Sequence, residues 1–488
     1  MCACVALMFS RRTVGAAVSM WPPGLLLLGL LFAPPNSRAE DWPWFLGPRH
    51  TGESAETNVS LDWSKSPPPT LWKQSIGTGY SAPSVLGDRV VVHHRQGNEE
   101  IVSCRNVADG VEVWKHAYPS SFVDPYGYNN GPRCSPLLTA EHCVTLGADG
   151  ILCCLSIADG TPIWQKNLKT EFQLPESFFG VGCSPILDGD RLIVLVGGQP
   201  DAAVVAFNFA DGAVLWQSSG KSTWNGAETD VRGTPYDWTG DEQVVSYSSP
   251  IIAEIHGRRH VLCLLRHGLV SLDPESGQEN FHYWFRARVH ESVNAARPVV
   301  VNDQILLSAA YAVGSALLKV NPDGKSFTEV WRSRSNLLSH WTTPIHVDGC
   351  VYGFSGRHEN EGELRCINLA DGQVRWTAQG YDGPLTGLQR DRTTGQIIDV
   401  ATGKEIPYPF FGRGSLTRVG DRFITLGERG TVAIVEVNKD KFVEHGRFAL
   451  DEIHYPAWAA PVLSNSRLFL RSEDWLVCLD LTTGASPE

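Results

Sequence analysis

The sequence is poor in charge, and in basic residues in particular. Charged residues make up 19% of its 488 positions, too few for a disordered, tail-bearing chain. There are 41 Lys and Arg against 53 Asp and Glu, which gives a formal net charge of -12 at pH 7. Because nucleic-acid affinity comes mainly from clustered Lys and Arg, this balance argues against a nucleic-acid partner.

Several catalytic motifs are also missing. The sequence has no Cys-x-x-Cys-His motif, which excludes covalently attached c-type haem. It has no glycine-rich phosphate loop, no nucleophile elbow and no His-x-x-x-His pair on a predicted helix. His93 and His94 are adjacent in an alternating strand pattern, so their rings would face opposite ways and could not share a metal ion. We therefore predict no metal site.

The first 39 residues differ in kind from the rest. Arg11 and Arg12 precede an apolar run at 25–33, and small residues lead up to Ala39. This is the layout of a secretory signal peptide, and the run is far shorter than the roughly 20 residues that a membrane span needs. We predict a signal peptide at 1–39, export to the periplasm or cell envelope, and no transmembrane span after cleavage. The paired arginines leave the twin-arginine route open as an alternative.

A turn motif recurs along the remaining chain. An Asp-Gly pair is followed by Trp five positions after the Asp, and Asp-Gly between alternating apolar runs is a strong hairpin signal. The four instances are Asp109 with Trp114, Asp159 with Trp164, Asp211 with Trp216, and Asp371 with Trp376. Each unit therefore reads as a strand, a tight turn and a strand that ends near Trp.

A second feature lies upstream of these turns: a residue followed by Pro at the start of an apolar strand, here called the pre-Pro position. Proline is tolerated at the first residue of a strand. The pre-Pro positions are Ala82, Ser135, Ser184, Ser249, Arg297, Thr343 and Ala460. About four short strands fit in each unit, as in a propeller blade. The units counted are 81–118, 134–168, 183–218, 248–285, 296–333, 342–379, 414–450 and 459–484.

The predicted fold is therefore an all-β, eight-bladed β-propeller. The last unit lacks its Trp strand, and the segment around Trp72 supplies a matching strand at the other end of the chain. We predict that this N-terminal strand closes the ring, with a strap at 40–68 and the propeller at 69–488. An open solenoid is the alternative. We expect a monomer.

Six tryptophans are predicted to have a structural role, packed between neighbouring blades: Trp72, Trp114, Trp164, Trp216, Trp331 and Trp376. All but Trp72 are expected to be buried, each against a turn glycine of the repeat. A second set of positions lies five residues before the turn, where Cys104, Cys154, Cys366 and Cys478 occur and Ala206 replaces them in another unit. A position that accepts Cys or Ala indicates a small apolar side chain packed between sheets.

The Ala-Asp-Gly-x-x-x-Trp unit resembles the tryptophan-docking repeat of quinoprotein alcohol dehydrogenases and of BamB-like outer-membrane assembly lipoproteins. The leader Trp42-Pro43-Trp44-Phe45-Leu46-Gly47-Pro48-Arg49, Thr51-Gly52 and Gly427-Glu428-Arg429-Gly430 are similar to exported bacterial proteins with PQQ-like (pyrroloquinoline quinone) propeller repeats. The resemblance covers nearly all of the chain after residue 39. It implies the eight-bladed fold, and one branch implies PQQ with Ca²⁺ in the central funnel.

The dehydrogenase branch carries further expectations that this sequence meets only in part. Some quinoprotein dehydrogenases place a vicinal disulfide against the quinone, and Cys153 with Cys154 has that spacing. Since Cys154 also occupies the small apolar position of the repeat, we interpret the pair as structural. Ca²⁺ needs several oxygen ligands, and the family's ligand motif does not map onto any stretch of this sequence. No cofactor is firmly implied, and PQQ with Ca²⁺ is kept as an alternative.

Residues just before the innermost strand of each blade should converge at the mouth of the propeller. They are rich in aromatic residues and Arg, which suits an anionic or hydroxyl-rich ligand. The alternative is that each Arg pairs with a nearby acid such as Glu291 and only ties blades together. The predicted ligand-binding funnel consists of Arg133, Arg297, Arg413, Trp341, Trp458, Tyr455, Glu291 and Asn294.

Two insertions, 217–247 and 380–413, interrupt the repeat and offer further binding surface. The sequence therefore predicts a non-catalytic exported scaffold that binds a protein partner or a small polar or carbohydrate ligand at the funnel and these loops. The alternative function is a PQQ-dependent dehydrogenase that oxidises an alcohol or sugar. No catalytic residue is assigned.

Overall fold

Strands account for most of the regular structure. The computed structural model describes residues 39–229, 233–381, 383–392 and 396–483. The predicted signal peptide, 1–39, lies outside the described residues apart from its last position. The described helices are all short, and none has the length and apolar character needed to cross a bilayer. They are α1 (Leu168–Glu171), α2 (Lys221–Trp224), η1 (Glu359–Glu361) and η2 (Leu385–Gly387).

The described chain contains nine sheets: seven of four strands, one of five and one of three. The first four in chain order are β3 (Ser84–Leu86), β4 (Arg89–Gln96), β5 (Glu99–Asn106) and β6 (Glu112–Pro119); β7 (Leu137–Leu138), β8 (His142–Leu146), β9 (Ile151–Ser156) and β10 (Pro162–Asn167); β11 (Ile186–Asp188), β12 (Arg191–Gly198), β13 (Ala202–Asn208) and β14 (Val214–Ser218); β15 (Ile251–Ile255), β16 (Arg258–Leu264), β17 (Gly268–Leu272) and β18 (Glu279–Trp284).

The remaining sheets include two that take a strand from the N-terminal segment. They are β19 (Val299–Val301), β20 (Gln304–Ala309), β21 (Gly314–Val320) and β22 (Phe327–Ser333); β23 (Ile345–Val347), β24 (Cys350–Ser355), β25 (Glu363–Asn368) and β26 (Val374–Ala378); β1 (Glu53–Ser54) with β30 (Ser415–Val419), β31 (Arg422–Leu426), β32 (Val432–Glu436) and β33 (Glu444–Phe448); β2 (Thr70–Ser75) with β34 (Val462–Ser464), β35 (Arg467–Arg471) and β36 (Trp475–Asp480); and the separate β27 (Leu388–Arg390), β28 (Ile397–Asp399) and β29 (Glu405–Ile406).

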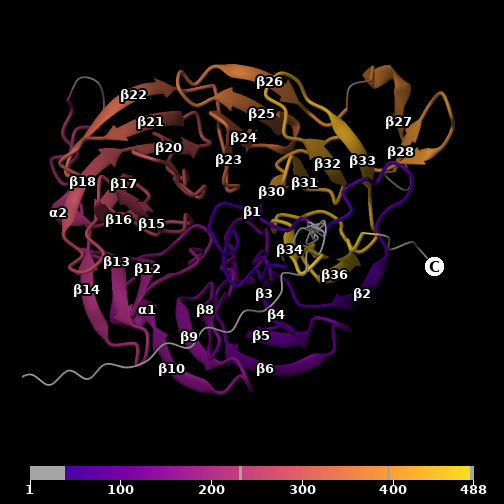
Figure 1. The fold of residues 1–488 in the computed structure, drawn as a ribbon. Helices are drawn as coiled ribbons and strands as arrows, with labels where there is room; N and C mark the ends of the chain where they lie inside the picture. Colours follow the sequence, from indigo (N-terminus) through magenta and orange to yellow (C-terminus); the bar gives the residue numbers. More distant parts are fainter. Residues whose placement is uncertain (1–38, 230–232, 382, 393–395, 484–488) are drawn as a thin grey trace, which may run out of the picture. The chain divides into compact units, whose positions relative to one another are not determined.

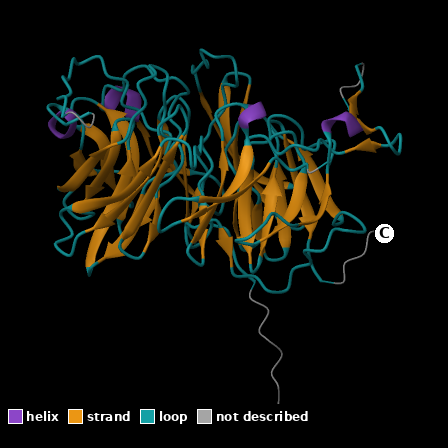
Figure 2. Cartoon of the chain, turned by 90° about the horizontal axis from the view of Figure 1, so that it is seen from above, coloured by secondary structure: helices purple, strands orange, loops and turns teal. Residues whose placement is uncertain are grey.

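Successive sheets pack face to face around a common centre (Figures 1 and 2). The buried apolar clusters lie between consecutive sheets: Val102 of β5 packs in one cluster with Cys153 of β9, for example. A further cluster joins the last sheet to the first, because it contains Phe469 of β35 and Val90 of β4. The prediction of an all-β chain is confirmed, and many four-stranded sheets arranged in this way are consistent with a β-propeller.

The N-terminal strand β2 pairs with β36, the last strand of the described chain. The pairing is antiparallel, with Trp72 opposite Cys478 and Ser75 opposite Trp475. Trp72 is buried in the cluster that joins the last sheet to the first. Residues that are 400 positions apart in the sequence therefore share one sheet.

Each of the six predicted docking tryptophans reaches into the next sheet. Every indole N–H donates a hydrogen bond of 2.8–3.1 Å to a backbone carbonyl there: Trp72 to Val107, Trp114 to Ile157, Trp164 to Phe209, Trp216 to Pro274, Trp331 to Leu369 and Trp376 to Asn438. Five of the rings also lie against a turn glycine, for which Gly160 beside Trp114 is an example. For Trp376 the expected glycine contact is wrong: its ring lies near Phe442, because the seventh unit has no Asp-Gly turn. The expected burial is also wrong for Trp164, Trp331 and Trp376, which are only half-buried.

The ten cysteines from Cys104 to Cys478 are all buried and unpaired. Cys104 lies opposite Trp114, and Cys154 lies opposite Trp164, so these thiols fill the space beside the docking rings. The Cys153 and Cys154 thiols are both free, as the structural interpretation of this pair requires.

Burial should make these thiols inert in the folded protein. It raises the pKa of Cys104, Cys134 and Cys154 to about 12 in each case, so almost no thiolate exists at pH 8. We expect that a thiol reagent such as DTNB at pH 8 labels none of the ten in native protein and all ten in guanidinium chloride. Rapid native labelling of any of them would contradict the buried assignment.

The strap, residues 40–68, runs across the centre of the sheets (Figure 1). Trp42 forms backbone hydrogen bonds with Val85 of β3, and Pro43 accepts one from Leu138 of β7. Farther on, β1 pairs in parallel with β30. The strap thus contacts the innermost strands of several sheets and places Phe45 and Leu46 at the base of the central cavity.

A central cavity as the candidate functional site

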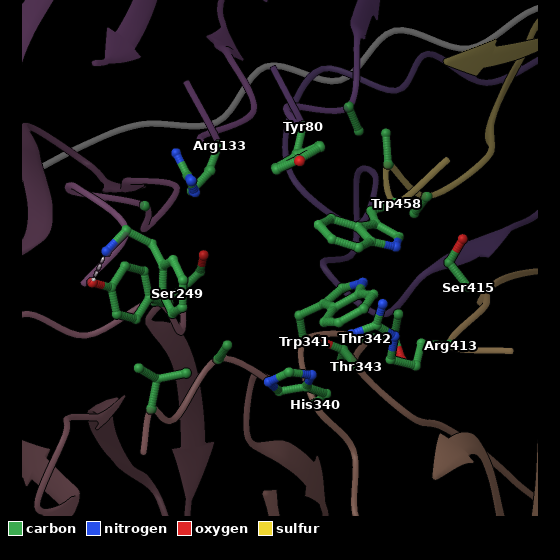
Figure 3. A pocket seen from close by; sticks show the side chains of 18 of the residues that line it. Tyr80, Arg133, Ser249, His340, Trp341, Thr342, Thr343, Arg413, Ser415 and Trp458 are labelled. Carbon is green, nitrogen blue, oxygen red and sulfur yellow. Dashed lines mark hydrogen bonds between the residues drawn. The ribbon is translucent and has the colours of Figure 1, made fainter. Parts of the chain in front are cut away.

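The described chain contains a cavity of about 500 Å³ where the loops before the innermost strands meet. Its wall combines aromatic rings, hydroxyl groups and three arginines, Arg133, Arg357 and Arg413. Figure 3 shows Trp341, Trp458 and Arg413 on one side, facing Arg133 and Ser249 across the open space. Segments far apart in the sequence thus build one site, which is the convergence that the repeat predicts.

Hydroxyl groups at the pre-Pro positions form the lower wall. Ser135, Ser184, Ser249 and Thr343 all line the cavity. The Ser135 backbone N–H donates to Ser184 Oγ at 3.0 Å, and the Ser184 N–H donates to Ser249 Oγ at 2.9 Å. The Ser184 and Ser249 hydroxyls thus accept from the preceding blade, and a hydroxyl that accepts one hydrogen bond still has a proton to donate.

The aromatic wall is a continuous set of ring contacts. Trp458 lies 4.7 Å from Tyr80 and 4.9 Å from Trp341, measured between ring centroids, and Trp341 lies 4.9 Å from His340. His340 is neutral, because burial first, and then the charge of Arg413, lower its pKa to about 3. The wall therefore offers flat apolar faces of the kind on which sugar rings and other planar groups stack.

Arg413 holds the two tryptophans in place. Its guanidinium carbon lies 4.9 Å from the Trp341 ring and 5.1 Å from the Trp458 ring. The same group donates to the buried carboxylate of Glu428, at 2.7 Å from Nη2, and Trp458 Nε1 donates to that carboxylate at 3.1 Å. Burial lowers the pKa of Arg413, but the hydrogen bonds and charge of Glu428 outweigh this and raise it above its ordinary value.

Arg133 is compensated in a similar way. Its Nη2 donates to Asp124 at 2.8 Å, and the Asp124 side chain is fully buried. Burial lowers the pKa of Arg133, and Asp124 opposes that effect. Two of the three lining arginines are thus neutralised by acids, as the alternative interpretation of the sequence expected, although the acids are Asp124 and Glu428 rather than Glu291.

Arg357 is the lining arginine that sequence reasoning missed. Its guanidinium lies 4.4 Å from the centre of the Tyr311 ring, and no described carboxylate lies within ion-pair distance of it. Arg357 follows Gly356 after β24, whereas the prediction considered only segments before an innermost strand. The prediction also did not include Asp124 and Glu428, which lie in the loops between β6 and β7 and between β31 and β32. No periodic signal marks any of the three.

Of the eight residues predicted for the funnel, five line the cavity: Arg133, Arg413, Trp341, Trp458 and Glu291. The other three lie elsewhere. Asn294 is buried and donates to the carbonyls of Leu265 and Phe285. Tyr455 is 40% exposed and lies behind the lining, with its ring 6.0 Å from that of Trp458 and 5.0 Å from the guanidinium of Arg429. Arg297 is buried beside the strap, where Nη1 donates to the His50 carbonyl.

Where the structure describes them, the two insertions reach the cavity only through Tyr247 and Arg413, at their C-terminal ends. In the first, Trp224 and Tyr236 pack around His267 and Trp284 of the fourth blade. The second forms the separate sheet β27–β29, which projects at the edge of the view in Figure 1. The first therefore reinforces one blade, and the second adds a surface of its own.

The cavity does not fit the Ca²⁺ of a quinone cofactor. No group of three or more His, Cys, Asp or Glu among the described residues could hold a metal ion. Glu291 is the one carboxylate in the lining, and the nearby Glu428 already accepts from Arg413 and Trp458. Ca²⁺ requires six to eight oxygen ligands. One carboxylate beside Arg133, Arg357 and Arg413 also gives the lining too little negative charge for a divalent cation.

Comparison with known proteins finds both groups that the repeat resembles, BamB-like proteins and quinoprotein alcohol dehydrogenases. Residues 67–253 and 234–378 match the family model described as outer membrane protein assembly factor BamB. A search of curated proteins gives no match. Among solved structures, BamB from Moraxella catarrhalis is 14% identical with a TM-score of 0.53, over 86% of this chain and 100% of its own. Quinohemoprotein alcohol dehydrogenase from Comamonas testosteroni is 12% identical with a TM-score of 0.55, over 93% and 82%. At such identities these likenesses show the fold alone.

Proposed function

Because this chain belongs to the family described as outer membrane protein assembly factor BamB, we propose that it is an eight-bladed, non-catalytic β-propeller. We also propose, from the lining of the central cavity, that it binds a hydroxyl-rich ligand such as a carbohydrate there. The eight sheets that contain β3 to β26 and β30 to β36, with β2 paired to β36, support the eight blades and their closure. The predicted signal peptide supports export to the periplasm or cell envelope.

We infer a neutral, hydroxyl-rich ligand mainly from the balanced charge of the aromatic cavity. Arg133 and Arg413 are each paired with a buried acid, and the two remaining charges in the lining, Arg357 and Glu291, are of opposite sign. The wall therefore offers little net attraction to a polyanion. What it offers instead is the Trp341 and Trp458 faces together with a row of hydroxyl groups. Stacking faces and fixed polar groups favour a sugar.

Trp341→Ala should weaken ligand binding. The ligand is unidentified, so the probes are a panel of neutral β-1,4-glucan and chitin oligosaccharides, measured by calorimetry and tryptophan fluorescence. We expect at least one of them to bind and Trp341→Ala to raise its Kd by about tenfold or more, because a central aromatic contact commonly carries 1.4 kcal/mol or more. Trp238→Ala, in the first insertion and outside the cavity lining, is the matched control and should leave Kd unchanged.

The dehydrogenase alternative is tested with the same preparation. Protein incubated with PQQ and Ca²⁺ should not reduce an artificial electron acceptor in the presence of alcohols or sugars. Turnover that EDTA abolishes would overturn the non-catalytic proposal.

A protein partner is the second candidate. The family description as an assembly factor favours it, as does the small sheet β27–β29, which is separate from the other described sheets. Leu385 and Val400 beside this sheet are 67% and 53% exposed. Deleting residues 385–406 should leave oligosaccharide binding intact, which separates this surface from the cavity.

A further inference from the structure

Arg297 breaks the pattern of the repeat. The other six pre-Pro positions carry Ala, Ser or Thr, and this one carries the largest cation. The side chain is 2% exposed. Its Nη1 donates to the His50 carbonyl at 3.1 Å, but Nε and Nη2 have no hydrogen-bond partner among the described residues. Two buried nitrogen atoms of the charged guanidinium therefore have no hydrogen-bond acceptor among the described residues.

The other buried arginines show how unusual this is. Arg95 and Arg266 each donate to three or more carbonyls. Arg105 has an unpaired Nε, but it donates to the Gly110 carbonyl and lies 3.7 Å from Glu112. Arg471 also leaves Nε and Nη2 unpaired, but it donates to three acceptors through Nη1, and the charge of Glu473 acts on it. Arg297 has one acceptor and no acid that acts on it. Burial alone lowers its pKa, to about 9, so the group stays charged at neutral pH.

The part of the strap beside Arg297, residues 44–50, contains no carboxylate. His50 is neutral, because burial first and then Arg297 lower its pKa to about 3. Its Nδ1 contacts the Phe45 carbonyl at 3.2 Å, and its ring stacks on Trp44 at 5.2 Å. Trp44 Nε1 is a further buried donor without a partner in the described chain. The junction of strap and blade is therefore rich in N–H donors and carries one uncompensated positive charge.

A buried guanidinium without a counter-charge is costly, and buried charges in proteins are normally paired. We propose that Arg297 and the overlying strap enclose one small inorganic anion of the halide class, such as chloride. The anion accepts from Nε and Nη2, neutralises the charge and fastens residues 44–50 to the fifth blade. The site is separate from the ligand cavity, whose wall includes Thr343 but not Arg297.

The test is a melting experiment on the full chain in which chloride replaces gluconate at constant ionic strength. We expect chloride to raise Tm by on the order of 2 °C in a saturable way, because an anion that binds only the folded state stabilises it by mass action. Arg297→Thr introduces the residue type found at the next pre-Pro position, Thr343. Chloride should not raise the Tm of this variant. In gluconate it should melt no lower than the wild type, since it removes an unpaired buried charge.

Arg266→Met is the matched control, because it removes a buried arginine whose donors already have carbonyl acceptors. Its Tm should fall in both salts, but the chloride-dependent rise should persist. A second measurement does not depend on any variant: diffraction from wild-type crystals grown in bromide should give an anomalous peak beside Nε and Nη2 of Arg297. An equal chloride effect in Arg297→Thr, or a water molecule in place of the anomalous peak, would overturn the proposal.

Discussion

Trp114→Ala is expected to lower the free energy of unfolding by about 3–5 kcal/mol, the usual cost of removing a large aromatic side chain from a packed site. Trp114 is 7% exposed, its N–H donates to Ile157 of the next sheet at 2.9 Å, and its ring covers Gly160. Gly160 has a φ of +74°, and a Cβ at this position would collide with the indole ring. The two sheets therefore fit each other at this point, and Ala would leave a cavity between them.

Val113 offers a matched control in the same strand. It is adjacent to Trp114 in β6 and is 42% exposed, since its side chain faces the outside of the propeller. We expect Val113→Ala to change the free energy of unfolding by about 0.5 kcal/mol or less, as is usual for exposed positions. Urea denaturation followed by far-UV circular dichroism measures both variants. Similar losses for the two would show that the docking contact does not hold adjacent sheets together.

The Asp-Gly to Trp spacing made this contact predictable. A turn glycine with positive φ and an outer-strand Trp are both local requirements, so they recur in the sequence at a fixed distance. Where a unit has no Asp-Gly turn, only part of the contact forms. Trp376 has no turn glycine beside its ring, although its N–H still donates to the Asn438 carbonyl. The pairing of β2 with β36 was also readable, because the two ends of the chain carry complementary parts of one blade.

The sequence predicted the residues of the candidate site only where they occupy regular positions of the repeat. Arg133, Trp341, Arg413 and Trp458 precede innermost strands, and the structure brings all four to the cavity. Asp124, Arg357 and Glu428 lie in loops of variable length, so no spacing identifies them. Arg297 follows the repeat but lies outside the cavity lining, because the strap, which is not part of the repeat, lies over it. Contacts between a repeating scaffold and a non-repeating segment leave no periodic signal.

The arrangement around Glu428 links stability to the proposed ligand site. Its carboxylate is fully buried and accepts from the Arg413 backbone N–H at 2.8 Å as well as from the Arg413 guanidinium and Trp458 Nε1. Without this acceptor, Arg413 would be a buried charge with no acid partner, and Trp458 would lose the hydrogen bond that fixes its ring. One residue thus supports both the fold of the seventh blade and the stacking face of the cavity.

Glu428→Ala is therefore expected to cost about 3–5 kcal/mol in the free energy of unfolding, as for other buried ion pairs that lose one partner. Glu428→Gln keeps an acceptor of the same shape and should cost less, while Asp421→Ala removes an exposed acid from its pair with Arg422 and should cost about 1 kcal/mol or less. Urea denaturation ranks the three. A Glu428→Ala protein as stable as Asp421→Ala would mean that Arg413 finds another partner, and the charge balance from which the ligand class is argued would no longer hold.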